Sequence, residues 1–150
     1  MGRSLMSTST GSIEDEVRRL IVELRVLENT AESLQLRVNL VNANLTELNL
    51  ASMSLEGIEK KDSNSIFVPI GGGSYIKAIL EETDKVVYGV GAGVAIEKTI
   101  KEAKEDIANR IAELSKAKVA LEQQLNQVLA GMRERQTRLQ ELTSRLRRQG

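Results

Sequence analysis

Apolar residues recur in alternating steps of four and three along the first part of the chain. This first heptad ladder has thirteen positions, of which twelve are apolar if alanine is counted. A period of 3.5 residues held over six heptads is typical of a coiled-coil helix. The pattern therefore predicts such a helix over residues 12–58. The ladder consists of Ile13, Val17, Leu20, Leu24, Leu27, Ala31, Leu34, Val38, Val41, Leu45, Leu48, Ser52 and Leu55.

A second heptad ladder predicts another coiled-coil helix over residues 99–150. Its members are Ile100, Lys104, Ile107, Ile111, Leu114, Lys118, Leu121, Leu125, Val128, Met132, Arg135, Leu139, Leu142 and Leu146. Charged residues occupy three positions, namely Lys104, Lys118 and Arg135. Charges in a seam, the face formed by a ladder, can fix register and orientation. Alternatively, their long stems reach out of the seam to water. The sequence leaves both alternatives open.

Local signals place the starts of the two helices. Ser12 with Asp15, and Thr99 with Glu102, have the spacing of a capping box. Residues 1–11 are rich in Ser, Thr and Gly, and we expect a flexible N-terminal tail there. The helices have roughly equal lengths, about 70–75 Å at 1.5 Å per residue. An antiparallel hairpin buries two equal seams completely, so we expect Leu55 near Ile100, Ile13 near Leu142, and both termini at one end.

The middle segment, residues 59–98, has a different pattern. Two pairs of short β-type runs surround Gly71–Gly73 and Gly91–Gly93. Such runs around glycine turns predict two β-hairpins. Pro69 has no N–H to donate to a ladder, so it should lie at an edge or a bulge. The predicted fold class is α+β, mainly α: a long helical hairpin with two β-hairpins between its helices.

Two short hairpins leave strand edges and apolar faces uncovered, and isolated hairpins are marginal in water. We therefore expect partner subunits to complete them as a sheet or barrel. The alternative is a small self-contained sheet packed on the helix ends. The predicted assembly residues are Phe67, Val68, Ile70, Tyr75, Ile76, Val86, Val87, Tyr88 and Val90.

Composition excludes most chemistry. The chain has no Cys and no His, so thiol nucleophiles, Ser-His-Asp triads and Cys/His metal sites are ruled out. The 89–93 stretch lacks the Gly that a dinucleotide fingerprint needs at position 94, where Val94 stands. We predict no catalytic, cofactor-binding or metal site, and no enzyme.

Charge and hydropathy limit the classes of partner that the chain is expected to bind. Lys+Arg and Asp+Glu both number 21, so the net charge of zero argues against nucleic acid as a partner. No stretch is long and apolar enough for a membrane span. Residues 133–148 carry a local basic excess, which suits a helix C-terminus or an acidic partner. Nucleic-acid binding is weaker there because no aromatic side chains are interleaved.

The two hairpin sequences, residues 68–78 and 84–99, resemble the prefoldin alpha-subunit family. Their glycine-rich motifs are more similar to those of archaeal members. The resemblance implies a cytoplasmic, ATP-independent chaperone without a cofactor. It implies a hexamer of two alpha and four beta subunits whose hairpins build a double β-barrel. It also implies that the coil ends hold non-native polypeptides and pass them to a group II chaperonin.

Helix ends fray, since their last backbone groups are unsatisfied and they have fewer packed neighbours. Fraying would expose apolar seam residues to an unfolded chain, with Leu5 and Met6 adding contacts. These same residues could instead be ordinary seam, and the whole chain a structural scaffold without client binding. The predicted tip residues are Ile13, Val17, Leu20, Leu139, Leu142 and Leu146.

Overall fold

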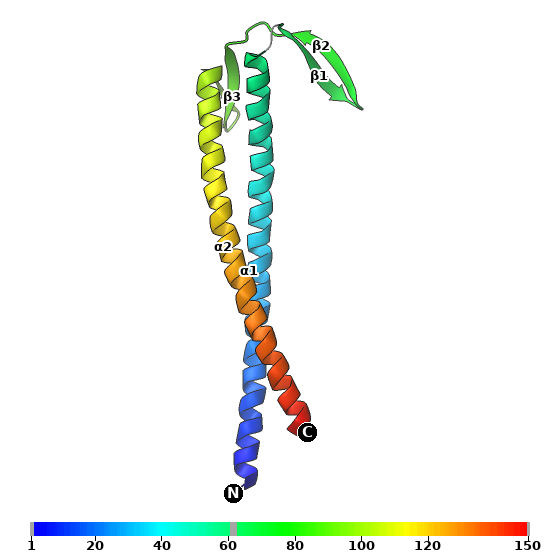
Figure 1. The fold of residues 1–150 in the computed structure, drawn as a ribbon, viewed down its shortest axis with the longest axis vertical. Helices are drawn as coiled ribbons and strands as arrows, with labels where there is room; N and C mark the ends of the chain where they lie inside the picture. The colour runs from blue at the N-terminus through cyan, green and yellow to red at the C-terminus, as the bar shows by residue number, and fades with distance from the viewer. Residues whose placement is uncertain (1, 61–62, 150) are drawn as a thin grey trace. The chain divides into compact units, whose positions relative to one another are not determined.

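The computed structural model describes residues 2–60 and 63–149, with side chains described from residue 11 onward. Two helices, α1 (Gly2–Glu59) and α2 (Ile100–Gln149), flank four strands (Figure 1). The strands are β1 (Ser65–Gly71), β2 (Ser74–Ile79), β3 (Lys85–Gly91) and β4 (Val94–Thr99). The chain divides into two compact units, Met1–Val41 with Ala117–Gly150, and Asn42–Lys116.

Burial along the helices follows the two heptad ladders. All thirteen positions of the first ladder and all fourteen of the second are buried or half-buried. Leu142 has no exposed surface, and Leu20 is 5% exposed. Because a 3.5-residue period keeps one face of a helix against its partner, this burial confirms the predicted seams.

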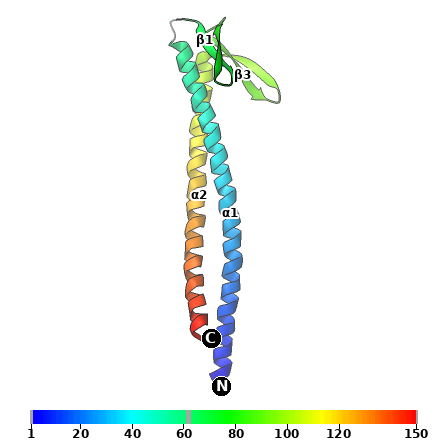
Figure 2. The same cartoon turned by 90° about the vertical axis from the view of Figure 1, so that its right-hand side faces the viewer.

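In the unit formed by Met1–Val41 and Ala117–Gly150, α1 and α2 lie side by side, as both views show (Figures 1 and 2). Arg135 Nε lies 2.8 Å from Glu23 Oε2, and Arg138 Nε lies 3.0 Å from Glu16 Oε1. The residue number rises on α2 as it falls on α1, so the segments are antiparallel. Glu16 and Arg138 lie within about one turn of Ile13 and Leu142, as the predicted register requires.

In the unit formed by Asn42–Lys116, the helix ends share a small apolar core. Leu55, Ile100, Ala103 and Ile107 are buried together. This cluster confirms that Leu55 lies near Ile100. Six half-buried residues pack against the cluster: Leu48, Ala51, Ile58, Val86, Tyr88 and Ile111.

The charged seam positions behave in two ways. Lys104 and Arg135 reach across to the other helix, with Lys104 Nζ 2.9 Å from Glu59 Oε2. Lys118 pairs instead with Glu122 of its own helix at 3.8 Å. Two of the three charges therefore tie the helices in register, whereas Lys118 provides no such tie.

The predicted start agrees with the structure for α2 but not for α1. The Glu102 N–H donates to Thr99 Oγ1 at 3.1 Å, which confirms the predicted cap of α2. In contrast, α1 begins at Gly2, so Ser12 lies inside the helix and the predicted start there is wrong. No proline lies between Gly2 and Ser12, so nothing there interrupts the helix. A Ser-Asp pair with capping spacing can lie inside a helix that has already begun. The side chains of Leu5 and Met6 lie outside the described residues.

Both predicted hairpins are present as separate two-stranded antiparallel sheets, β1–β2 and β3–β4. Pro69 was expected at an edge or a bulge, and it lies in a two-stranded sheet next to a register shift between Pro69 and Gly71. The same shift lies between Gly89 and Gly91 of β3–β4, where no proline is present. The two hairpins also repeat each other at an offset of twenty residues. Val68 pairs with Ile76, and Tyr88 pairs with Ile96. The β1–β2 and β3–β4 hairpins therefore share the same strand pairing and the same turn position.

Candidate functional site

The β1–β2 hairpin presents apolar side chains to solvent. Phe67 is 71% exposed and Tyr75 is 62% exposed. Each two-stranded sheet also leaves one edge of every strand without a strand partner in the described part of the chain. Exposed apolar groups beside open edges favour pairing with another chain. The predicted assembly residues in this hairpin are thus accessible: Phe67, Val68, Ile70, Tyr75 and Ile76.

The β3–β4 hairpin is partly covered by its own chain. Val87 and Val90 are exposed, but Val86 and Tyr88 are half-buried against the apolar cluster of the helix ends. Side chains alternate across a strand, so one face of β3 packs inward and the other stays open. The structure therefore brings seven of the nine predicted assembly residues to the surface and packs two within the subunit.

Tyr88 fastens this second hairpin to α2. Its ring centre lies 4.9 Å from Lys98 Nζ and 5.0 Å from Arg110 Cζ. Lys98 also forms an ion pair with Asp106 of α2. Cations over an aromatic face attract its negative quadrupole, so these contacts hold β4 and α2 together through Tyr88. The sequence showed no signal for this arrangement, because the four residues belong to three different elements.

The six tip residues form a closed seam. Leu20 and Leu142 are buried, whereas Ile13, Val17, Leu139 and Leu146 are half-buried. Leu20 lies on α1 and Leu142 on α2, within the same compact unit. A polypeptide could therefore contact these two side chains fully only after α1 and α2 separate locally.

An ion-pair network closes the same end of the seam. Arg138 donates through Nε to Glu16 Oε1 at 3.0 Å and through Nη2 to Glu16 Oε2 at 3.4 Å. It also reaches Glu141 at 3.3 Å. The hydrogen bond from Arg138 lowers the pKa of Glu16, and the same bond raises the pKa of Arg138. The network favours the closed helix pair while Glu16 is ionised.

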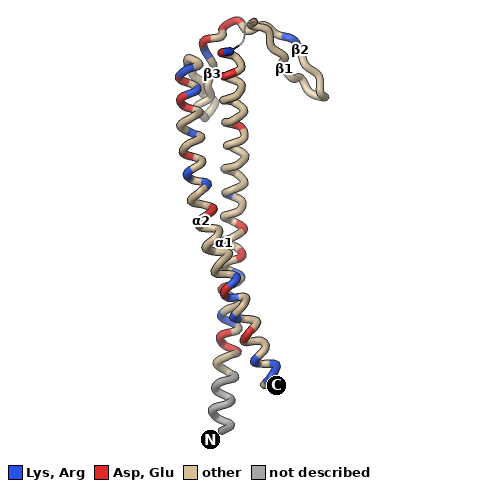
Figure 3. Tube along the Cα trace, in the orientation of Figure 1, with Lys and Arg blue, Asp and Glu red and all other residues tan. Residues whose placement is uncertain are grey.

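The basic excess of residues 133–148 is divided by this network. Arg135 and Arg138 are engaged with acidic groups of α1, whereas Arg147 and Arg148 lie exposed in the last turn of α2. Figure 3 shows acidic and basic residues mixed at this end of the helices. From the sequence, the arginines form one basic group, but in the structure Arg135 and Arg138 form ion pairs across the seam.

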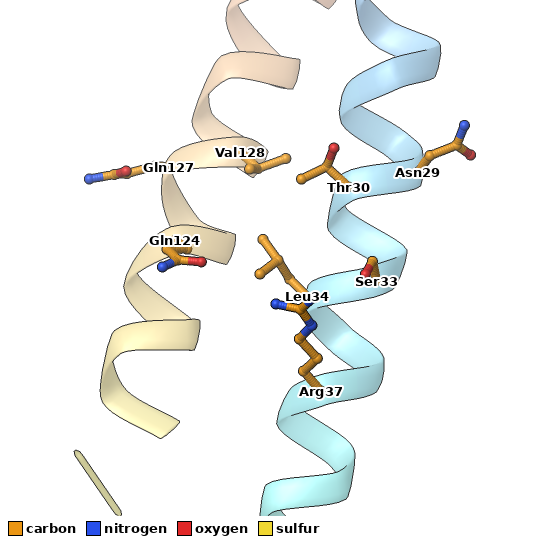
Figure 4. Close-up of a pocket in the computed structure, with 8 residues that line it drawn as sticks. All are labelled: Asn29, Thr30, Ser33, Leu34, Arg37, Gln124, Gln127 and Val128. Atoms are coloured by element: carbon orange, nitrogen blue, oxygen red, sulfur yellow. The ribbon is translucent and has the colours of Figure 1, made fainter. Parts of the chain in front are cut away.

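A groove of about 570 Å³ lies between α1 and α2 in the unit of Met1–Val41 and Ala117–Gly150. Thr30, Leu34 and Val128 point into it, while Asn29 and Gln127 point away (Figure 4). Its lining has one charged side chain, Arg37, and no nucleophile beside a base. The groove has no arrangement that acid–base or nucleophilic catalysis requires.

Metal sites and membrane-spanning helices are two further possibilities. The described residues contain no group of three or more acidic residues arranged to hold a metal ion. Within the described helices, none is long and apolar enough to cross a membrane.

One apolar surface escaped the sequence reasoning. Val22, Val26, Leu36 and Leu40 are each more than half exposed on α1. Their spacing follows the same four-and-three rule as the seam, shifted to another face of the helix. A search for a second heptad series within α1 would have found them.

Comparison with known proteins gives a consistent picture. The family model described as Prefoldin subunit matches residues 27–145. Prefoldin subunit alpha of Methanopyrus kandleri is 34% identical over 114 residues, covering 75% of this chain and 73% of that protein. Prefoldin subunit alpha of Methanobrevibacter smithii is 33% identical over 121 residues, covering 81% and 78%.

A solved structure shares the fold. The cryo-EM structure of filamentous PFD from Methanocaldococcus jannaschii superposes with a TM-score of 0.58 at 23% sequence identity. The match covers 81% of this chain and 95% of the other.

Proposed function

The chain belongs to the prefoldin family as an alpha-type subunit, and we propose that it works in a cytoplasmic, ATP-independent holdase. In this proposal the complex holds non-native polypeptides and delivers them to a group II chaperonin. Prefoldin is a chaperone family without enzymatic chemistry, so the function lies in surfaces rather than in a catalytic site.

The observation that carries the proposal is the open β1–β2 hairpin. Phe67 and Tyr75 are exposed to water on a free monomer. Burying a large apolar side chain is favourable by about 1.5–3 kcal/mol. Partner strands would bury Phe67 and Tyr75 and pair the open edges. We propose that prefoldin beta subunits and a second alpha subunit supply those strands, giving two alpha and four beta subunits around a β-barrel body.

Client binding is proposed at the six tip residues. Because Leu20 and Leu142 are buried in the closed seam, binding requires transient separation of α1 and α2 there. Local opening near helix ends costs less than global unfolding. Each opened arm would grip weakly, and several arms together would supply avidity.

Assembly is tested by native mass measurement of the chain with and without a single-hairpin, beta-type prefoldin subunit. A complex of two alpha and four beta subunits is expected. Phe67→Ser should reduce its yield, whereas Phe67→Leu keeps an apolar side chain and should preserve it. Undiminished assembly of the Phe67→Ser variant would argue against the hairpin interface.

Tip opening is tested with a cross-link. The chain has no native Cys, so Glu16→Cys with Arg138→Cys can be joined by a short bis-maleimide without side reactions at other thiols. Joining should abolish suppression of client aggregation by the assembled complex, relative to the same variant left unjoined. The matched control is Glu59→Cys with Lys104→Cys, which also replaces a pair across the helices and should leave protection intact when joined. Full protection by the first joined variant would contradict opening at the tip.

The second candidate function is a structural scaffold without client binding. It shares the helices and the assembling hairpins. It predicts that the assembled complex forms normally yet does not slow aggregation of a denatured client, whether or not nucleotide is present. The aggregation assay therefore separates the two functions even when the native mass agrees with both.

A further inference from the structure

The outer face of α1 carries a second apolar stripe, separate from the seam. Within the unit of Met1–Val41 and Ala117–Gly150, this outer stripe has six positions at alternating steps of four and three. Its four apolar members are between 58% and 66% exposed. The outer stripe consists of Val22, Val26, Asn29, Ser33, Leu36 and Leu40.

The apolar members of the outer stripe lie on the side of α1 away from the seam, while Asn29 and Ser33 also border the groove between α1 and α2. When the first heptad ladder is assigned to positions a and d, the stripe takes positions c and f. These positions face away from the a/d side of a helix. The burial agrees, since Leu34 and Val38 are each 6% exposed while Leu36, between them in sequence, is 64% exposed.

The composition of the outer stripe is unusual for a solvent-facing surface. None of its six positions is charged, although the exposed face of a coiled-coil helix usually carries charge. In contrast, the exposed large hydrophobic residues of α2, within the described residues, are Val119 and Leu129. They also fall on a four-and-three series, but the two positions between them in that series are polar, and one is charged: Glu122 and Asn126. The stripe is thus specific to α1.

The spacing identifies the kind of partner. A 3.5-residue period lets each side chain meet a second helix at regular intervals. An extended non-native polypeptide has no such period and would not require it. The occupant that fits the outer stripe is therefore another long helix.

We propose that the outer stripe packs antiparallel against the same stripe of a second copy of this chain. Reversing the stripe places Val22 opposite Leu40, Val26 opposite Leu36, and Asn29 opposite Ser33. Apolar positions then meet apolar positions on both sides of a two-fold axis, as a self-complementary interface requires. The central Asn29 and Ser33 side chains can hydrogen-bond, and a polar layer of this kind specifies register.

One charged residue limits the strength of this contact. Glu32 borders the stripe beside Ser33, close to the two-fold axis, so the Glu32 carboxylates of the two copies approach each other. Like charges oppose association. The contact is therefore weak and reversible, and it joins two arms without using the β-hairpins, which takes it beyond the proposed function.

Disulfide trapping tests the register directly, because the chain has no native Cys. The full-length Val26→Cys and Leu36→Cys proteins are oxidised separately and as a mixture. The mixture should yield several times more linked dimer than either protein alone. Linking of Val26→Cys mainly to itself would indicate parallel pairing, and an equal yield in all three samples would indicate random collision; either result overturns the proposal.

Two matched substitutions test the energetics. Leu36 and Leu50 lie on the same helix, and both are 64% exposed, but Leu50 lies outside the paired stretch. Leu36→Gln should weaken self-association in sedimentation velocity by about tenfold, while Leu50→Gln changes it by less than about twofold. Glu32→Gln should strengthen it. Circular dichroism confirms that each variant stays helical.

The result that would overturn the proposal is equal self-association of the Leu36→Gln and Leu50→Gln proteins. Reduced protection of a denatured client by Leu36→Gln, with self-association unchanged, would also overturn it, because the occupant would then be a non-native polypeptide. The cross-linking and sedimentation measurements need no beta-type subunit, so failure of the proposed chaperone function would not affect them.

Discussion

Ala92 occupies the turn position of β3–β4 that Gly72 occupies in β1–β2. The φ angles are +51° at Ala92 and +57° at Gly72, and the following glycine, Gly93 or Gly73, has φ of +75° in both turns. Positive φ at both central residues is the requirement of the tight hairpin turn that matches strand twist. The second hairpin therefore holds an alanine in a conformation that favours glycine.

Ala92→Gly should stabilise the β3–β4 hairpin. A residue with a Cβ in the left-handed region costs about 1 kcal/mol or slightly more, which glycine avoids. Amide hydrogen exchange in β3 and β4 should slow, and Gly72→Ala should accelerate exchange in β1 and β2. Unchanged or faster exchange in the Ala92→Gly hairpin would show that the turn is not strained.

Lys118→Leu should raise the thermal stability of the chain. Lys118 lies at a half-buried seam position and pairs only weakly, at 3.8 Å, within its own helix. Replacing it with leucine adds apolar burial of about 1 kcal/mol. The control is Lys116→Leu, at an exposed position two residues earlier, which should have little effect on unfolding followed by circular dichroism. A loss of stability in Lys118→Leu would indicate that its charge helps to set register.

Acidification should loosen the end of the seam that holds Glu16. The pKa of Glu16 is lowered from its ordinary value of 4.5, chiefly by the hydrogen bond from Arg138. A group whose pKa is lowered on folding stabilises the folded state above its unfolded pKa, and this contribution is lost as pH falls through the folded value. Protection from hydrogen exchange near residues 13–20, taken relative to the intrinsic exchange rate at each pH, should therefore fall below about pH 4.5.

Glu16→Gln provides the control for that pH effect. The neutral amide cannot titrate, so protection near residues 13–20 should be lower in this variant at neutral pH and should change less on acidification. If the acid-induced loss of protection were the same in both proteins, another carboxylate would be responsible.

Leu142→Ala should destabilise the closed tip strongly. Leu142 has no exposed surface, and truncation of a fully buried leucine costs about 2–5 kcal/mol. Leu129→Ala, at a position 36% exposed on the same helix, should cost much less. Thermal unfolding and exchange rates compare the two variants. Similar losses would mean that the tip seam is not tightly packed.

Local pattern was sufficient for much of this fold. Every position of the two heptad ladders is buried or half-buried, because a 3.5-residue period is a property of the chain alone. The ladders missed Ala103, which is fully buried in the cluster with Ile100 and Ile107. Glycine-punctuated β runs likewise placed both hairpins, since positive φ selects glycine. The start of α1 was missed because a capping pair inside a helix resembles one at its start.

What the tertiary structure decided concerns partners distant in sequence. Only the packed helices show that Arg135 and Lys104 cross to α1 while Lys118 does not, because a long side chain chooses among groups that packing brings within reach. Only the packed hairpin shows that Tyr88 lies against the apolar cluster while Val68, at the matching position of the other hairpin, is 40% exposed. The sequence by itself determined which residues form seams and strands. Tertiary packing decided which of those surfaces are closed and which remain open.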